Sequence, residues 1–304
     1  MTGGVVTADL RQAGALRAAR SVAARYGIRV PDARVLMDCN NTVVLLGPLP
    51  LVAKVCAVTT RPKGAAALAA ELDIALHLGR NGAPIALPST ELPAVVHREG
   101  DRALTFWRYQ RHDPDAAVDG RAAGRALREC HRAMDTYEGR PSSFLGRQVA
   151  RAGRLLADTR ALSELPDADR AFLADQYHRL TAELGGRDLR WRLLHGDPHR
   201  GNVLVDGRRC LMIDFESVCT GPMEWDLSAL PGGGAGQFPD VDRSLLALLR
   251  RLRSVCVAVW CSLQAGRVAE LRSAAERHLG LLRRATPQPL RGESQCSRLP
   301  ARSN

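Results

Sequence analysis

One short segment, residues 195–216, constrains the fold of this chain more than any other. It reads His-Gly-Asp-Pro-His-Arg-Gly-Asn, an apolar run, an Asp-Gly pair, a second apolar run, and Asp-Phe-Glu. An Asp-Gly pair between two short apolar runs predicts a β-hairpin. Because a hairpin returns its two ends to the same place, Asp197, Asn202 and Asp214 should meet at its open end.

The strand register sets a condition on this cluster. A turn at Asp206 and Gly207 sets Asn202 opposite Leu211 and His199 opposite Asp214. A strict ladder would then send Asn202 and Asp214 to opposite faces of the hairpin. For both side chains to reach one metal ion, strand pairing must stop near Ile213.

These residue types suit phosphoryl transfer from a nucleotide, which depends on positioning and on charge neutralisation. Such a reaction needs a carboxylate for the attacking hydroxyl, oxygen ligands for magnesium, and a cation for the α- and β-phosphates. Asp197 fits the first need, Asn202 and Asp214 the second, and Lys54 the third. The step of five from Asp197 to Asn202 matches the catalytic loop H-x-D-x-x-x-x-N.

Lysine is rare in this chain, and its use at position 54 therefore invites an explanation. Lys54 and Lys63 are the two lysines among 43 basic residues. Lys54 lies in the apolar run Val-Ala-Lys-Val, which reads as a strand. In the following helix Glu71 shares a face with Leu68, Leu72 and Ala75. A glutamate inside an apolar stripe is costly without a partner, and Lys54 is the natural one.

Together the motifs HGDPHRGN, IDFE and GPMEWDL resemble those of the aminoglycoside phosphotransferase-like family, small-molecule kinases that share the bilobal protein-kinase fold. Residues 195–202 match the family's HGDxHxxN signature, and Asp214 matches its metal-binding aspartate. The resemblance extends over about residues 30–285, but its highly specific part is 193–230. Two features depart from the kinase pattern. The turn at residues 39–42 replaces a G-x-G-x-x-G loop, and Glu216 replaces the glycine of D-F-G.

The resemblance implies an α+β, bilobal protein-kinase-like fold, with a small strand-rich N-lobe and a larger, mainly helical C-lobe. It also implies ATP- and Mg²⁺-dependent transfer of the γ-phosphate to a hydroxyl of a small molecule. The acceptor would be an aminoglycoside-like antibiotic, a sugar or an amino alcohol. Asp197 would be the catalytic residue, and Asn202 and Asp214 would hold the metal. The cofactor-binding residues would be Lys54, Glu71, Phe106, Trp107, Asn202 and Asp214, with adenine beside the two aromatic residues.

The pattern of apolar and turn residues predicts a similar layout. Residues 1–110 form the nucleotide-binding lobe, with helices at 8–26 and 64–80 and strands at 35–38, 42–46, 51–55, 94–97 and 103–107. Residues 111–285 form the helical lobe, with a linker at 111–115, strands within 193–213, and helices at 224–230, 241–264 and 267–285. The glycines at 232–236 read as a flexible loop or a substrate-side lid. Residues 286–304 are expected to be disordered.

Composition excludes several other classes of protein. The net charge of +11 comes from scattered arginines rather than a basic stripe, which argues against a nucleic-acid partner. No apolar run is long enough to span a membrane, and no signal peptide is evident. Eight cysteines without a CxxC pair favour buried free thiols in a cytoplasmic protein.

Several alternatives remain open at this point. A pseudokinase-like nucleotide-binding or regulatory module is the main one, although such modules usually lose the base, the metal ligand or the lysine. A protein kinase is disfavoured because the A-P-E signature is missing. His195, Glu224 and Asp226 read as structural, the two acids as helix caps. The acceptor, the choice between ATP and GTP, and the oligomeric state stay undetermined.

A polycationic acceptor would need carboxylates gathered around it. The C-lobe is rich in arginine, which favours a less cationic alcohol. The acids that could serve a polycation are Glu216, Glu224, Asp240, Asp242 and Glu270.

Overall fold

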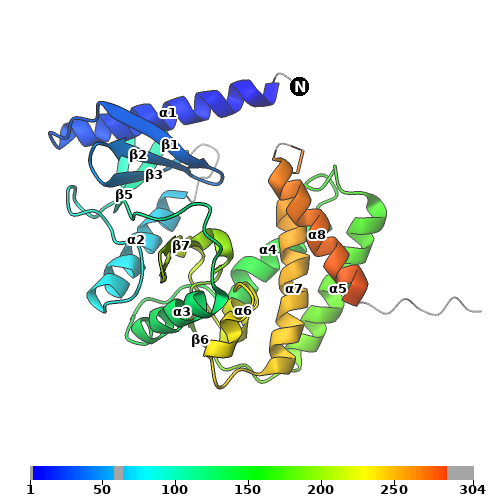
Figure 1. Cartoon of the computed structure of the whole chain (residues 1–304). Coiled ribbons are helices and arrows are strands. Elements are labelled where there is room, and N and C mark those ends of the chain that lie inside the picture. Colours follow the sequence, from blue (N-terminus) through cyan, green and yellow to red (C-terminus); the bar gives the residue numbers. More distant parts are fainter. Residues whose placement is uncertain (1–2, 58–63, 264, 267, 286–304) are drawn as a thin grey trace, which may run out of the picture.

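A five-stranded antiparallel sheet and two helices form the smaller of two lobes (Figure 1). The computed structural model describes residues 3–57, 64–263, 265–266 and 268–285. In spatial order the strands are β1 (Asp32–Asp38), β2 (Thr42–Gly47), β3 (Leu51–Ala57), β5 (Arg102–Arg108) and β4 (His97–Glu99). Helix α1 (Gly3–Arg25) lies along one face of the sheet, and α2 (Gly64–Arg80) lies on the other (Figure 1).

Alternation along β3 explains this two-sided packing. Ala53 and Val55 are buried against Ala19 and Val22 of α1. The residues between and beyond them, Lys54 and Cys56, point to the opposite face, because successive side chains of a strand alternate. The lysine therefore emerges on the side of the sheet that carries α2.

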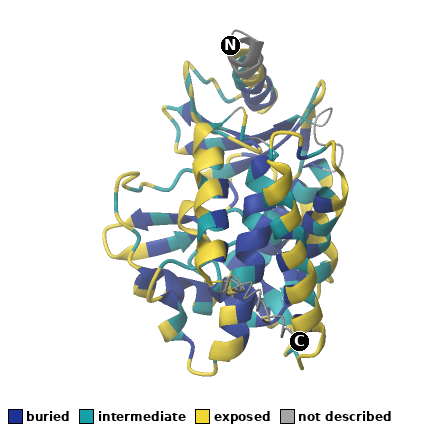
Figure 2. Cartoon of the chain, turned by 90° about the vertical axis from the view of Figure 1, so that its right-hand side faces the viewer, coloured by how far each residue is buried: buried dark blue, intermediate teal, exposed yellow. Residues whose placement is uncertain are grey.

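The larger lobe is mainly helical, and its buried residues lie where its helices meet (Figure 2). Its longer helices are α3 (Gly120–Met134), α4 (Ala150–Ala157), α5 (Asp167–Gly185), α7 (Arg243–Ser262) and α8 (Ala269–Ala285). A π-helical turn (Leu145–Val149) precedes α4, and the short helix α6 (Met223–Leu227) follows the last strand. The strands are β6 (Arg192–Leu194), which pairs with β9 (Cys219–Gly221), and the hairpin of β7 (Val203–Asp206) and β8 (Arg209–Met212). Three short 3₁₀ turns lie at Arg200–Asn202, Phe215–Ser217 and Gly234–Gln237.

Helix α2 belongs to the cores of both lobes. Near its start, Leu68 packs with Cys56 of the sheet. Further along, Ile74 and Leu78 lie in the same core cluster as Leu127 of α3 and residues of the hairpin. Glu71 lies between these two contacts, so the helix holds its carboxylate at the junction of the lobes. Because α2 packs into both cores, the division at residue 110 stays a proposal.

The hairpin forms as predicted, but its register differs by two residues. Asp206 pairs with Arg209, so the turn consists of Gly207 and Arg208, and the expected pairing of Asn202 with Leu211 was wrong. Gly207 has φ +58°, which fits the first central position of a type II′ turn, where glycine is preferred. The last ladder bond runs from Ile213 N to Asn202 O at 3.0 Å.

Strand pairing therefore ends at Ile213, as the predicted cluster requires. The next residue, Asp214, has φ +65° and ψ +64°. This left-handed conformation turns the chain away from the ladder. The predicted pairing of His199 with Asp214 is thus also wrong, but Asp214 is free to turn toward the other lobe.

The remaining differences from the predicted elements are small. The strand expected at 94–97 forms at 97–99, and the helix expected at 224–230 spans 223–227. The seven cysteines within the described ranges are free as expected, although Cys39 is exposed and Cys261 is half-buried. The tail at 286–304 lies outside the described residues.

The glycine segment at 232–236 packs closely on α3. A Cβ on Gly120 would lie 1.8 Å from the carbonyl oxygen of Gly232. A Cβ on Gly124 would lie 2.4 Å from that of Gly234. Backbone meets backbone here, so Gly120 and Gly124 of α3 and Gly234 of the segment allow the close approach.

We expect Gly120→Ala to lower the free energy of unfolding by about 1–3 kcal/mol, because the added methyl group meets a backbone carbonyl that cannot rotate away. Urea denaturation would measure it. Gly185→Ala is the matched control, since nothing lies within 4 Å of its added Cβ. Helix propensity should leave that variant unchanged or more stable by up to about 1 kcal/mol. A Gly120→Ala protein as stable as the wild type would contradict the close packing.

Candidate active site

The ammonium group of Lys54 is surrounded by three carboxylates. Its Nζ lies 2.9 and 2.8 Å from the two oxygens of Glu71, 2.9 Å from Asp214 Oδ1 and 2.9 Å from Glu216 Oε1. The Lys54 side chain is 11% exposed. The predicted pairing of Lys54 with Glu71 is present. Asp214, in the segment that follows strand β8 of the hairpin, also pairs with Lys54.

Negative charge exceeds positive charge in this cluster. Burial acts to lower the pKa of Lys54, but the three carboxylates outweigh it, so the pKa lies above its ordinary value. Burial raises the pKa of Glu71 to about 7 despite the opposing effect of Lys54, and Asp214 and Glu216 add to the rise. Partial burial acts to raise the pKa of Asp214, but Lys54 lowers it overall. An additional cation would therefore be stabilised at this site.

The residues present fit a magnesium ion. Oxygens of Glu71, Asp214 and Glu216 lie within 4.8 Å of one another. The Asn202 Nδ2 donates to the backbone oxygen of Asp197 at 2.9 Å, which leaves its side-chain oxygen available as a ligand. All of these donors are oxygens, the ligands that Mg²⁺ takes in proteins. Glu71 and Glu216 thus join the predicted ligand Asp214 as candidates, while Asn202, the other predicted ligand, lies at the end of the adjoining ladder.

Asp197 lies at the start of the loop that leads into the hairpin. Its Oδ1 is 3.2 Å from Nη1 of Arg253, and its Oδ2 is 3.8 Å from Nε2 of His199. The Asp197 side chain is 33% exposed, whereas that of Arg253 is 4% exposed. The carboxylate therefore has one oxygen tied to the protein interior, while the other is on its more open side.

A buried aspartate on α6 holds the loop around Asp197 through backbone hydrogen bonds. Asp226 accepts from the backbone N–H groups of His195 and Gly196, at 2.9 and 2.7 Å. It also lies 2.8 Å from Nε2 of His131. Asp226 is thus an anchor for the Asp197 loop and not a helix cap. The other predicted cap, Glu224, accepts from the backbone N–H of Asp242 at 2.9 Å.

His195 has the structural role that the sequence favoured. Because the Ile213 carbonyl 3.0 Å away can only accept, Nε2 carries the proton, and Nδ1 accepts from Asp197 N–H at 3.3 Å. Burial lowers the pKa of His195, which favours this neutral form. The neighbouring Gly196 has φ +89°, and a Cβ there would lie 1.9 Å from Ser217 O. The position therefore requires glycine.

The structure separates the two aromatic residues that were predicted to flank adenine. Thr105 pairs with Lys54, so Trp107, two residues on, shares the Lys54 face of the sheet. Its Nε1 donates to Thr105 Oγ1 at 2.9 Å. Phe106 points to the opposite face, into the core beneath α1, with its ring 5.2 Å from that of His97. Its side chain is therefore not brought to the site.

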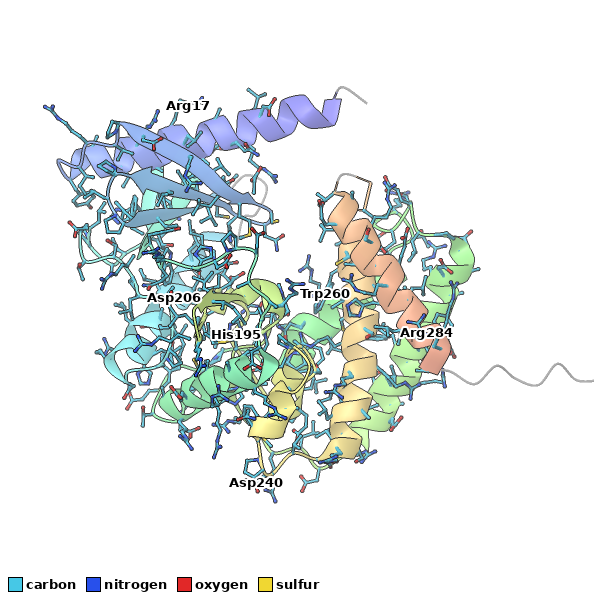
Figure 3. The ribbon with its side chains drawn as sticks, in the orientation of Figure 1. Arg17, His195, Asp206, Asp240, Trp260 and Arg284 are labelled. Carbon is cyan, nitrogen blue, oxygen red and sulfur yellow. The ribbon has the colours of Figure 1, made fainter. Side chains whose placement is uncertain are left out.

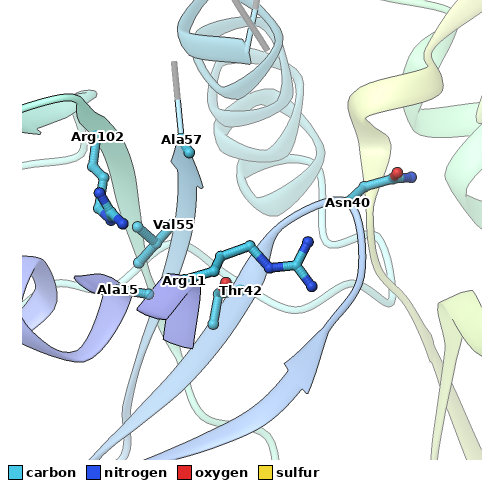
Figure 4. A pocket seen from close by; sticks show the side chains of 7 residues that line it. All are labelled: Arg11, Ala15, Asn40, Thr42, Val55, Ala57 and Arg102. Carbon is cyan, nitrogen blue, oxygen red and sulfur yellow. The ribbon is translucent and has the colours of Figure 1, made fainter. Parts of the chain in front are cut away.

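The turn between β1 and β2 occupies the place of a glycine-rich loop and is held by side chains. Arg11 of α1 pairs with Asp38 at 2.8 Å, and Asp38 also accepts from Thr42 at 2.8 Å. The hollow beside this turn has a volume of about 30 Å³, roughly the share of one water molecule (Figure 4). At the tip of the turn, Asn41 donates to Glu216.

Sequence reasoning missed several residues of the site. In the sequence Glu216 reads as a replacement for glycine or as an acid for a polycation, not as a partner of Lys54, and Asn41 and Gln148 give no signal. Arg253 could have been found by the argument that found Glu71. It lies in a helix between apolar residues that are buried, such as Leu249 and Cys256, and an isolated charge in such a stripe needs a partner.

The acids considered for a polycationic acceptor do not gather at Asp197. Glu216 is engaged with Lys54, Glu224 is buried under the start of α7, and Asp242 caps that helix. Asp240 lies at the end of the helical lobe that points away from the sheet (Figure 3). Glu270, near the start of α8, lies near Cys39, where burial and then Asp38 raise the pKa of the thiol and Glu270 adds to the rise.

Within the described ranges, no helix is both long enough and apolar enough to cross a membrane.

Comparison with known proteins bears on the family and the fold of the chain. A model of the phosphotransferase enzyme family matches residues 33–254. No individual curated protein matches the chain.

Solved structures with the same fold include three small-molecule kinases. An amicoumacin kinase in complex with AMP-PNP and Ca²⁺ has a TM-score of 0.64 at 16% identity, over 84% of this chain and 89% of that one. A spectinomycin phosphotransferase in complex with ADP has a TM-score of 0.56 at 18% identity, over 89% and 94%. A choline kinase from Streptococcus pneumoniae has a TM-score of 0.63 at 13% identity, over 88% and 99%. The predicted bilobal, protein-kinase-like α+β fold is confirmed.

The Glu71→Gln variant tests the charge balance around Lys54. The unfolded chain releases the Glu71 proton near its ordinary pKa of 4.5, whereas the folded protein holds it to about 7. Between these values the unfolded state binds fewer protons, so this contribution to stability is present below pH 4.5 and is lost as the pH rises to 7. We expect the free energy of unfolding to fall less between about pH 5 and about pH 7.5 in Glu71→Gln than in the wild type. Urea denaturation of both proteins at both pH values measures the change in the free energy of unfolding. An equal change in the two proteins would contradict the raised pKa of Glu71.

Proposed function

Because this chain belongs to the phosphotransferase enzyme family, we propose that it transfers the γ-phosphate of ATP, with magnesium, to a hydroxyl group of a small molecule. One observation carries the proposal. The Lys54 ammonium from the strand lobe lies 2.9 Å from the Asp214 carboxylate of the helical lobe. Asp214 directly follows the last residue of the ladder that also ends at Asn202, and Asn202 contacts Asp197.

Each side chain has a separate task in this proposal. Lys54, braced by Glu71, binds the α- and β-phosphates, and Trp107 lies on the face where adenine would pack. Asn202, Asp214 and Glu216 hold magnesium, which when bound neutralises charge on the phosphate oxygens. Asp197 orients the acceptor hydroxyl.

The transfer itself makes and breaks one bond to phosphorus. The acceptor oxygen bonds to the γ-phosphorus, and the bond from that phosphorus to the β–γ bridging oxygen breaks. ADP departs with the electron pair of the broken bond. The hydroxyl proton passes to Asp197, whose Oδ2 lies on the more open side of the carboxylate. Most of the acceleration in such reactions comes from positioning and electrostatic stabilisation.

The charges around Asp197 favour an acceptor with little positive charge. Arg253 and His199 flank the carboxylate, and Arg147 donates to the backbone oxygen of Glu216 nearby. The acids that a polycation would need are engaged elsewhere, as described above. We therefore propose a sugar, an amino alcohol or an antibiotic with few charges as the acceptor class. A screen of such alcohols for stimulated ADP release would identify it.

We expect Asp197→Asn to reduce turnover at least about 100-fold, because the amide cannot accept the hydroxyl proton. Magnesium-dependent ATP affinity should be unchanged, since Asp197 does not contact Lys54 or its carboxylates. Steady-state kinetics and calorimetry measure the two quantities. Full activity in this variant would refute the catalytic role. ATP binding without turnover of any acceptor by the wild type would instead favour a nucleotide-binding module.

We expect Asp214→Asn to lose most of the magnesium-dependent part of ATP affinity, because a charged ligand and a partner of Lys54 are removed. Asparagine tolerates the left-handed backbone of this position better than most residues, so the fold should be retained. Calorimetric titration with ATP, with and without magnesium, measures the effect. Asp206→Asn in the hairpin is the matched control and should bind as the wild type does. Unchanged affinity in Asp214→Asn would argue against a metal ligand at this position.

A further inference from the structure

A buried arginine outside the three sequence motifs contacts the proposed catalytic residue. Arg253 lies on α7 and is 3% exposed. Its Nη1 donates to Asp197 Oδ1 at 3.2 Å, and its Nη2 donates to the carbonyl oxygens of Gly196 and Trp225 at 3.1 and 2.8 Å. Its Nε donates to Ser228 Oγ at 2.7 Å.

These contacts leave the guanidinium group little freedom. Its carbon also lies 3.9 Å from the centre of the Trp225 ring, so the group is stacked as well as hydrogen bonded. A planar fork held along two of its edges aims the remaining N–H groups in a fixed direction. In this structure that direction leads to one oxygen of Asp197.

The two oxygens of Asp197 are consequently in different environments. Oδ1 is bound to the buried cation, while Oδ2, on the more open side of the carboxylate, has His199 at 3.8 Å. A carboxylate attached at one oxygen cannot rotate freely about its side-chain bonds. The second oxygen is then presented in one orientation to an incoming hydroxyl.

We propose that Arg253 is a positioning residue that orients Asp197 for phosphoryl transfer; this inference rests on the proposed function. Arg253 acts from α7, whereas the proposed catalytic residue and the metal-binding residues all lie in 195–216. A packing role alone would be met by an apolar side chain, and burying a cation is costly unless its partners are specific. Asp197 is the partner that carries the compensating charge.

The same loop offers a matched control for simple anchoring. Gln148, in the π-helical turn, donates from Nε2 to the Gly196 carbonyl at 3.1 Å, and its Oε1 accepts from Trp225 Nε1 at 2.9 Å. Gln148 and Arg253 thus hold the same carbonyl, but no contact joins Gln148 to the Asp197 carboxylate in the described structure. Gln148→Met removes one loop anchor and leaves the orienting cation in place.

The experiment compares Arg253→Gln, Arg253→Lys and Gln148→Met with the wild type. ADP release from ATP is followed with spectinomycin, kanamycin, choline and a panel of sugars as acceptors. We expect kcat to fall about 10- to 100-fold in Arg253→Gln, the range for a lost hydrogen bond to a charged group, with KM for ATP unchanged. Lysine cannot reproduce the fork, so Arg253→Lys should recover only part of the loss. Gln148→Met should fall much less than Arg253→Gln.

A double-mutant cycle separates orientation from structure. In the Asp197→Asn background, Arg253→Gln should leave the residual kcat almost unchanged, because the group it orients can no longer accept the proton. Thermal denaturation and calorimetry with Mg-ADP check that each variant is folded. Should Arg253→Gln unfold, Arg253→Lys, which keeps the charge and most of the volume, carries the comparison.

The outcomes distinguish this inference from the function on which it rests. A wild type that releases no ADP with any acceptor overturns the proposed function and the role of Arg253 with it. An active wild type whose kcat survives Arg253→Gln, or falls equally in Gln148→Met, overturns the role of Arg253 alone. Independent, multiplying effects of the Asp197 and Arg253 substitutions would also overturn it.

Discussion

The structure depends on one buried ammonium group. Lys54 enters from the sheet, and its partners Glu71, Asp214 and Glu216 come from α2 and from the segment after the hairpin. Removing one partner from a buried ion pair typically costs about 3–5 kcal/mol, so such a cluster strongly favours one relative placement of its elements. The same cluster concentrates negative charge where a metal–nucleotide complex would supply positive charge. One set of contacts thus joins the lobes and prepares the site.

Around this cluster, the proposed catalytic loop is held by buried polar residues. Asp226 binds two backbone N–H groups of the loop, and Gln148 and Arg253 bind the Gly196 carbonyl. Buried polar groups that are fully paired fix a conformation closely, because any displacement leaves one of them unsatisfied. For a reaction that depends on alignment, this rigidity is the main contribution that the protein fold can make.

The sequence predicted the parts of this arrangement that follow from local patterns. The pairing of Lys54 with Glu71 followed from a charge in an apolar stripe, and the place of Asp214 just beyond the ladder that ends at Asn202 followed from hairpin geometry. The predicted hairpin register was wrong by two residues. Gly207 is the first of the two turn residues rather than the second, and its positive φ, which the sequence does not state, decides this. The face of the sheet to which Phe106 points depends on the register of β5 with β3, and no local sequence pattern determines that register. Asn41 and Gln148 act through contacts distant in sequence, and one sequence contains no signal for them.

The position of α2 in two cores has a consequence for folding. Both lobes lose part of their interior without α2, since Leu68 packs with Cys56 of the sheet and Ile74 and Leu78 pack with α3 and the hairpin. The two halves should consequently lose their structure in a single cooperative transition rather than in succession. A fragment containing only the strand half would expose the far end of that helix and would be prone to aggregate. Independent exchange of either half between relatives is constrained by the same shared helix.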